Sequence, residues 1–380
     1  MRQIISLVLA LLASLILVGC GGSSSGGSQT PKVKFTSQVS FGDSLSDVGT
    51  YAVPAITAVG GGQFTINGAG KNWIELIAAQ LGLPAPCAAI TGGYGIAANT
   101  TPKSGCYGYA QGGARVFSQP GIGYTGTIAG ALTYPVAQQI SSHLTAVGGN
   151  FSGSEVVFVL AGANDILIEA QVAYPGYVAA CMGAGMTGCA GGGLTASAAQ
   201  TAALQIALGD VTGVADLLAN QVTTNITGKG AKYVVVVNVP DIANTPLAIA
   251  AGTSAQQLFD AFVTTFNTRI KTDLAGNANV LLVDAYTANR DEVTNPAAYG
   301  LTNVIGTACD VTGAFLTTNF PTSSGHGSSL GCSIANPASL TAGVTADTHY
   351  LFADDVHPTP YGYLQLARLI SRDMLIKGWL

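Results

Sequence analysis

The sequence predicts an α/β fold, built as a three-layer sandwich with a mainly parallel central sheet. Short, continuous runs of Val, Ile and Leu alternate along the chain with longer segments whose apolar residues recur every three or four positions. Such alternation is typical of parallel strands joined by helical crossovers, with helices covering both faces of the sheet. In such folds functional groups lie on loops at the carboxyl ends of the strands, so the residues that follow each strand are the first candidates for a site.

Four segments predict the strands of this sheet. Residues 38–41 (QVSF) form a short strand, and longer apolar runs follow at residues 155–160 (EVVFVL), 232–239 (KYVVVVNV) and 279–284 (NVLLVD). The three longer runs are apolar at nearly every position, which indicates strands that are buried on both faces.

Five further segments have the apolar spacing of helices. They are residues 72–81, 133–147, 196–226, 254–274 and 361–375. In the second of them, for example, Val136, Ile140 and Leu144 lie four positions apart. Side chains at this spacing line one face of a helix and can pack on a sheet.

Two stretches, residues 83–127 and 286–348, do not fit the alternating pattern. Both are rich in Gly, Ser, Thr and Asn, and both contain cysteines. We interpret them as long insertions over the sheet. They either shape a substrate cleft or serve as disulfide-held decoration, and the sequence leaves both interpretations open.

The N-terminal residues have the features of an export signal. Residues 1–19 combine a positive charge at Arg2 with an apolar run that is too short for a membrane span of about 20 residues, and they fit a secretory signal peptide. The run ends in LVGC at residues 17–20, which resembles the lipobox of bacterial lipoproteins. We therefore expect a lipid on Cys20 that holds the protein at the bacterial cell envelope, at the outer membrane, on its periplasmic face or at the cell surface.

The rest of the chain is predicted to contain a linker and one domain. Residues 20–31 are nearly all Gly and Ser after the cysteine and predict a flexible tether, and residues 32–380 predict a single folded domain. A net charge of −5 gives no basic surface for nucleic acid. The few histidines and cysteines do not have the spacing of a metal site, and no dinucleotide-binding motif follows a convincing strand, so we expect neither a metal nor a cofactor.

The cysteines agree with export. Apart from Cys20 the sequence has six, and an even number in an exported protein predicts disulfides. They fall into three local couples, which favours the pairs Cys87–Cys106, Cys181–Cys189 and Cys309–Cys332. A metal site or free thiols fit less well, because no close CxxC pair is present and histidines are rare.

The segment FGDSLSD at residues 41–47 is the first candidate for chemistry. Ser44 follows the first predicted strand, and Gly42 permits a sharp turn between them. A nucleophilic serine suits this position, because it is exposed at a strand end and a backbone N–H is available to an oxyanion. The same residues also fit a Ser/Asp-rich turn or a helix N-cap, so the segment alone leaves both interpretations open.

The segment DDVHPT at residues 354–359 is the second candidate. Asp354 lies three residues before His357, so one loop can present both side chains. A carboxylate beside a histidine fixes the imidazole tautomer and stabilises the imidazolium that forms in general-base catalysis. A capped turn before the last predicted helix is the structural alternative.

Together these two segments resemble the first and last sequence blocks of the GDSL, or SGNH, hydrolase family. Two middle blocks lie between them in the expected order, YAQGGA at residues 109–114 and GAND at residues 162–165. The second block is an imperfect match, because the family often has Asn where Gly108 stands. The four blocks span nearly the whole predicted domain, and the resemblance implies the flavodoxin-like SGNH hydrolase fold.

The resemblance also implies an activity and a site. Ser44, Asp354 and His357 would form a catalytic triad, and an oxyanion would be bound by the N–H groups of Ser44 and Gly113 and the side-chain amide of Asn164. The expected activity is hydrolysis of a carboxylic ester, a lipid or another acyl ester, through an acyl-enzyme, so that the chain would be a serine esterase or lipase.

Two other functions remain as alternatives on the same fold. One is acyl transfer, in which an acceptor alcohol replaces water, and the other is a non-catalytic surface binding protein. The complete set of four blocks argues against the second. Two GxSxG matches are rejected as nucleophile sites: the one at residues 22–26 lies in the linker, and the one at residues 327–331 lies in a Ser/Gly loop with no preceding apolar strand. His326 has no local carboxylate at a useful spacing.

Overall fold

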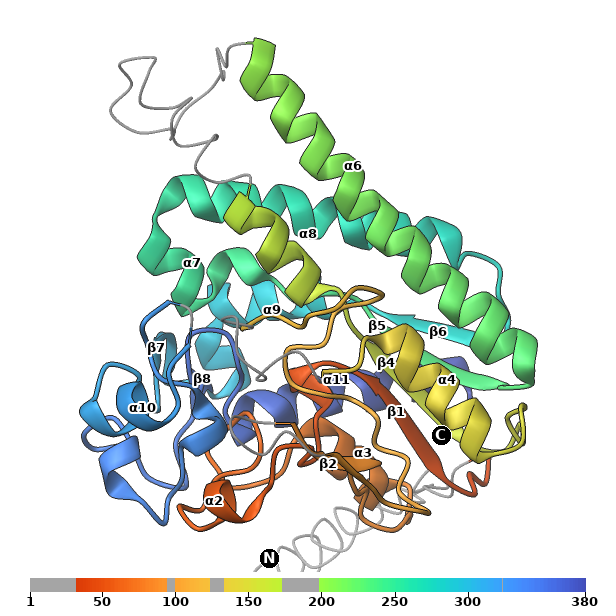
Figure 1. Cartoon of the computed structure of the whole chain (residues 1–380), viewed down its shortest axis with the longest axis horizontal. Helices are drawn as coiled ribbons and strands as arrows, with labels where there is room; N and C mark the ends of the chain where they lie inside the picture. Colours follow the sequence, from red (N-terminus) through yellow and green to blue (C-terminus); the bar gives the residue numbers. More distant parts are fainter. Residues whose placement is uncertain (1–31, 94–99, 124–132, 173–197, 323) are drawn as a thin grey trace, which may run out of the picture.

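The computed structural model describes residues 32–93, 100–123, 133–172, 198–322 and 324–380. At its centre is a parallel sheet with the strand order β1-β4-β5-β6 (Figure 1). The strands are β1 (Gln38–Gly42), β4 (Val156–Leu160), β5 (Tyr233–Val237) and β6 (Val280–Val283). Each lies where the sequence predicts a strand, and the prediction of an α/β fold with a mainly parallel sheet is confirmed.

A further segment extends the sheet beyond β1. Ser40 N–H donates to Tyr107 O at 3.1 Å, Tyr109 N–H donates to Ser40 O at 2.8 Å, and Gln111 N–H donates to Gly42 O at 3.2 Å. Residues 107–111 therefore run along β1 in the same direction. With this segment included, the strand order is the flavodoxin-like one, whose winding reverses beside the first strand. A site is expected at that reversal, at the carboxyl ends of the strands.

Three long helices cover one face of the sheet. They are α4 (Val136–Ala146), α6 (Ala198–Asn220) and α8 (Thr253–Asp273), and a π-helical turn continues α6 through residues 221–226. Val157 and Val159 of β4 belong to the apolar core on this side. Figure 1 shows α6 and α8 lying side by side over this face.

Two helices cover the opposite face. They are α3 (Trp73–Gln80) and α11 (Pro360–Lys377), which contact each other. Phe158 of β4 packs in this second core with Trp73 and Ile370. Because successive residues of a strand point to opposite faces, the fully apolar β4 supplies both cores, as its sequence predicts.

The stretch at residues 83–127 proves to be part of the sheet. It begins with the antiparallel pair β2 (Ile90–Gly92) and β3 (Thr100–Pro102) and then supplies the segment 107–111 beside β1. The interpretation of this stretch as an insertion outside the core is therefore only partly correct. Its strand-like segment lacks the long Val/Ile/Leu run by which the other strands are recognised.

The stretch at residues 286–348 also contains regular structure that the apolar pattern does not reveal. It includes most of α9 (Ala285–Thr294), then β7 (Asn303–Thr307) and α10 (Ala314–Asn319), and β7 pairs in parallel with β8 (Tyr350–Phe352) just beyond it. A separate apolar core lies within this part of the molecule, with Leu316, Phe320 and Leu330 fully or nearly fully buried. The remaining helices are α2 (Pro54–Thr57), α7 (Pro246–Ala251) and one at residues 163–172.

Two of the three predicted disulfides are present, Cys87–Cys106 and Cys309–Cys332. Cys181 and Cys189 lie outside the described residues, and so do residues 1–31 with the predicted signal peptide, the linker and Cys20. Within the described ranges, no helix combines the length and apolar character needed to cross a membrane.

Candidate active site

Ser44 lies directly beyond the carboxyl end of β1. At Gly42 the backbone φ is +151°, and a Cβ would come within 2.1 Å of the carbonyl oxygen of Leu160 on β4. Only glycine allows this close approach at the end of the strand. The chain then enters the 3-10 turn η1 (Ser44–Ser46), which the Asp43 side chain caps. Ser44 thus occupies the sharp strand-to-helix turn that suits a nucleophile.

The imidazole of His357 connects Ser44 to Asp354. Its Nε2 lies 2.7 Å from Ser44 Oγ, and its Nδ1 lies 2.8 Å from each carboxylate oxygen of Asp354. With the hydrogen on Nδ1, Nε2 is left free to accept the hydrogen of the serine hydroxyl. The ring of Phe64 lies against the imidazole, at a centroid distance of 5.0 Å. Hydrogen-bonding distances thus connect Ser44 through His357 to Asp354 without a break.

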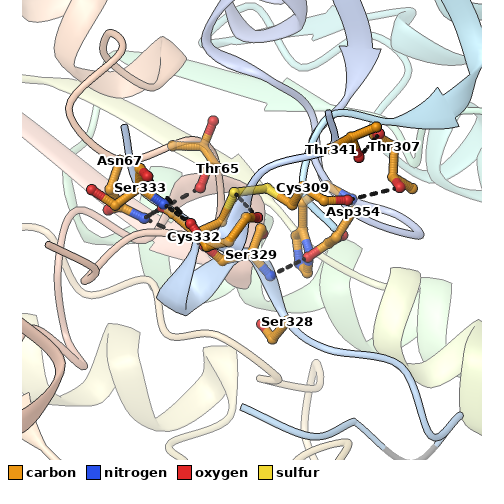
Figure 2. Close-up of a disulfide and its surroundings, with 12 residues drawn as sticks. Thr65, Asn67, Thr307, Cys309, Ser328, Ser329, Cys332, Ser333, Thr341 and Asp354 are labelled. Carbon is orange, nitrogen blue, oxygen red and sulfur yellow. Dashed lines mark hydrogen bonds and ion pairs between the residues drawn. A yellow bond between two sulfur atoms is a disulfide. The ribbon is translucent and has the colours of Figure 1, made fainter. Parts of the chain in front are cut away.

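The Asp354 carboxylate is buried and accepts several backbone hydrogen bonds. Oδ1 accepts the N–H groups of Val356 at 3.1 Å and His357 at 2.8 Å, both from its own loop. Oδ2 accepts the N–H of Ser329 at 2.8 Å, as Figure 2 shows. These donors fix the carboxylate in the orientation that faces the imidazole.

The pKa values of the pair favour an ionised acid beside a basic imidazole. Burial opposes charge on His357, but the Asp354 carboxylate, with weaker contributions from Asp43 and Asp355, raises the pKa of the imidazole above its usual 6.5. Burial also opposes charge on Asp354, but His357 and the hydrogen bonds from Ser329 hold the pKa of that carboxyl well below its usual range. An imidazolium formed during a reaction would be stabilised here.

Three potential oxyanion donors lie at the ends of adjacent strands. Ser44 follows β1, Gly113 follows the segment 107–111, and Asn164 follows β4. Among the described residues, the N–H groups of Ser44 and Gly113 have no protein acceptor. Asn164 Nδ2 donates one hydrogen to Ala114 O at 2.8 Å, and its second hydrogen remains available. The carboxyl edge of the sheet thus brings together the donors that the resemblance implies.

Two buried aspartates hold the segment that carries Gly113. Asp47 Oδ2 accepts the N–H of Gly112 at 2.9 Å. From the other side, Asp165 accepts the N–H of Val116 at 2.9 Å and Nε of Arg115 at 3.0 Å. The first, second and third sequence blocks are therefore tied together by carboxylate–backbone contacts, which sequence reasoning did not identify because they join distant segments.

The departure from the family pattern at Gly108 has a steric cause. A Cβ at this position would lie 2.6 Å from Cγ2 of Val48 and 2.8 Å from the carbonyl oxygen of Cys87. Gly108 N–H also donates to that same oxygen at 3.0 Å. The Cys87–Cys106 disulfide closes the chain around this contact, so there is no space for an asparagine side chain.

The loop that carries His357 makes a further contact that the sequence did not predict. His326 Nδ1 lies 2.8 Å from Oδ2 of Asp355, although the two residues are 29 positions apart. The absence of a local carboxylate near His326 is therefore no guide to its surroundings in the fold. Asp354 and Asp355 face different histidines, and only Asp354 contacts His357.

The sheet has the flavodoxin-like order, and the contacts from Ser44 through His357 to Asp354 lie at its carboxyl edge. A model of the GDSL-like lipase/acylhydrolase family matches residues 39–370, and the chain belongs to this family. A comparison with curated proteins found no match.

Proposed function

We propose that the protein is a serine esterase or lipase that hydrolyses carboxylic esters through an acyl-enzyme on Ser44. The observation that carries this proposal is the chain of contacts from Ser44 Oγ through His357 to Asp354, at 2.7 and 2.8 Å. The family acts on acyl substrates, which agrees with this geometry. No step of the proposed reaction requires a metal or a cofactor.

Catalysis begins with attack of Ser44 Oγ on the ester carbonyl carbon, while the hydroxyl proton moves to Nε2 of His357. The carbonyl oxygen becomes an oxyanion, which accepts hydrogen bonds from the N–H groups of Ser44 and Gly113 and from the Asn164 amide. Asp354 stabilises the imidazolium, because opposite charges lie within hydrogen-bonding distance. When the tetrahedral intermediate collapses, Nε2 gives its proton to the leaving alcohol.

The second half of the reaction uses the same groups. Water attacks the acyl-enzyme and gives a proton to Nε2 of His357. A second oxyanion forms and is bound by the same three donors. Its collapse releases the carboxylic acid and returns the proton from Nε2 to Ser44 Oγ, so the enzyme regains its starting state.

Covalent labelling with a fluorophosphonate tests the proposal. The reagent transfers its phosphonyl group only to a serine that is activated as a nucleophile, so we expect stoichiometric labelling of the peptide that contains Ser44. The Ser44→Ala variant serves as the control and should not be labelled. A folded wild-type protein that resists the reagent, or carries the label on another serine, would contradict the proposal.

Removal of one oxyanion donor should slow the reaction. Asn164→Ala deletes the hydrogen that would bind the oxyanion, so kcat should fall about 10²- to 10³-fold with little change in KM. It also removes the hydrogen bond to Ala114 O, so a small loss of stability is expected as well. Asn238→Ala is the matched control, because Asn238 also lies just beyond a strand but donates to Asp284. Steady-state kinetics that show equal losses in both variants would remove Asn164 from the oxyanion site.

We also propose that Cys20 carries a lipid in the mature protein, which would then be attached to the bacterial cell envelope. The support is the LVGC sequence that ends the apolar N-terminal run. Cys20→Ser should block lipidation, so the protein should appear in the soluble fraction or remain unprocessed. Mass spectrometry of the mature N-terminus provides the measurement, and an unmodified terminus at a residue other than Cys20 would disprove the anchor.

A further inference from the structure

The insertion at residues 286–348 makes direct contact with the proposed catalytic acid. Ser329 is fully buried in this insertion, and its N–H donates to Asp354 Oδ2 at 2.8 Å (Figure 2). The other backbone donors to this carboxylate, Val356 and His357, both bind Oδ1. Among the described residues, Ser329 is therefore the one backbone donor to Oδ2.

The segment that carries Ser329 is held firmly against the catalytic loop. The Cys309–Cys332 disulfide lies three residues beyond Ser329, and Cys309 N–H donates to Ala353 O at 2.8 Å, immediately before Asp354. The buried side chain of Asn67 donates to the carbonyl oxygens of Ser329 at 3.3 Å and Cys332 at 2.9 Å. Figure 2 shows Asn67, Ser329 and Asp354 around the disulfide. The position of Ser329 is thus fixed from two sides.

The same short segment also contacts the aspartate that follows. His326 lies three residues before Ser329 and contacts Oδ2 of Asp355 at 2.8 Å. On the other side, Asp355 O accepts the N–H of Leu247 at 3.0 Å. Residues 326–329 therefore hold both aspartates of the loop that ends in His357.

We propose that Ser329 is a positioning residue for the reaction, acting through its backbone N–H on Asp354. Rotation about the Cβ–Cγ bond of Asp354 moves both carboxylate oxygens, and both of them lie 2.8 Å from Nδ1 of His357. The N–H of Ser329 opposes this rotation by binding Oδ2, just as the N–H groups of Val356 and His357 oppose it by binding Oδ1. In this proposal the insertion at residues 286–348 holds the acid of the triad in its active orientation. The inference rests on the proposed ester hydrolysis.

Proline at position 329 removes the N–H selectively. Ser329 is the first residue of the 3-10 turn η6 (Ser329–Gly331), where proline is favoured. The preceding Ser328 has φ −87° and ψ 144°, which is compatible with a following proline. Ser329→Ala is the reference, because it removes the hydroxyl and keeps the N–H. Relative to Ser329→Ala, we expect Ser329→Pro to lower kcat about ten- to a hundredfold with little change in KM.

The same comparison in an Asp354→Ala background separates positioning from a general effect on the fold. Without the carboxylate the N–H has nothing to orient, so Ser329→Pro and Ser329→Ala should then have equal kcat. Cys309→Ala/Cys332→Ala provides a second test, since it releases the segment without changing its backbone donors, and its loss of kcat should likewise disappear in the Asp354→Ala background.

The possible outcomes each decide the proposal. Equal kcat for Ser329→Pro and Ser329→Ala in the wild-type background overturns it, and so does a loss that persists without Asp354. If Ser329→Pro does not fold, the double cysteine variant decides: no loss of kcat in that variant, or a loss that persists without Asp354, overturns the positioning role. Ser44→Ala is measured alongside: if it remains active, the proposed function fails, whereas an inactive Ser44→Ala with no effect of proline overturns the positioning role only.

Discussion

Replacing Ser44 with alanine should lower kcat for ester hydrolysis by a factor on the order of 10⁶, while the fold remains intact. The hydroxyl lies 2.7 Å from Nε2 of His357, and its removal takes away the only atom placed to attack the carbonyl. His357→Ala should have a similar effect, because the serine then loses its base. Since the two residues act in one step, the double variant should be little worse than either single variant. Single-turnover and steady-state assays of the purified variants would measure these effects.

Ser46→Ala is the matched control for this experiment. Ser46 lies in the same short turn and is buried, and its hydroxyl has no hydrogen-bond partner among the residues that the structure describes. We expect it to retain activity within a few-fold of wild type. If Ser46→Ala were as inactive as Ser44→Ala, the loss would reflect damage to the turn and would not identify the nucleophile.

The second large effect is expected at Asp354, and its neighbour Asp355 should behave differently. Asp354→Ala should lower kcat about 10⁴-fold, because the imidazole loses the group that orients it and stabilises its charge. Asp355→Ala should cost less than about tenfold, because Asp355 contacts His326 and not His357. Steady-state kinetics on the two variants provide the comparison. A greater loss in Asp355→Ala would show that Asp354 has been wrongly assigned as the acid of the triad.

The pH dependence of activity gives an independent check on Asp354. His357 must be neutral to accept the serine proton, and Asp354 raises the pKa of the imidazole. Activity of the wild type should therefore fall as the pH drops through a value above 6.5. In Asp354→Ala the imidazole loses this influence, so the acid limb of kcat/KM should move to lower pH. A limb that stays in place would mean that Asp354 does not act on His357.

The sheet could be predicted from the sequence because its strands are buried on both faces. The apolar runs that became β4, β5 and β6 stand out against the rest of the chain, and the longest helices have clear apolar spacing. The segment 107–111 escaped prediction for the opposite reason. It is short, contains Gly108, and is held to β1 on one side and to residues 87–89 on the other by backbone hydrogen bonds, which require no apolar side chains.

From the residues alone the proposed site was predictable only in its local parts, and the family resemblance was needed to connect them. Asp354 and His357 are three residues apart, so their partnership is visible in the sequence, and the strand-end position of Ser44 is also visible. The role of residues 327–331 was not, because Ser329 reaches Asp354 through its backbone N–H, a group that every residue but proline possesses. The GxSxG match at residues 327–331 was rejected as the site of a nucleophilic serine, and that rejection does not bear on a backbone contact.

Ser44 and His357 are separated by 313 positions in the sequence, and this separation has a consequence for the order in which the parts of the site are synthesised. The four strands of the sheet and all three oxyanion donors are contained in residues 38–283, whereas the acid and the base follow much later. During synthesis the strands of the sheet are therefore made well before the proposed acid and base. A chain cut between residues 283 and 350 would carry Ser44 but would lack His357, its proposed base. The proposed ester hydrolysis would therefore report only those molecules in which residues 354–357 have folded against the sheet, which a signal from sheet or helix content alone cannot do.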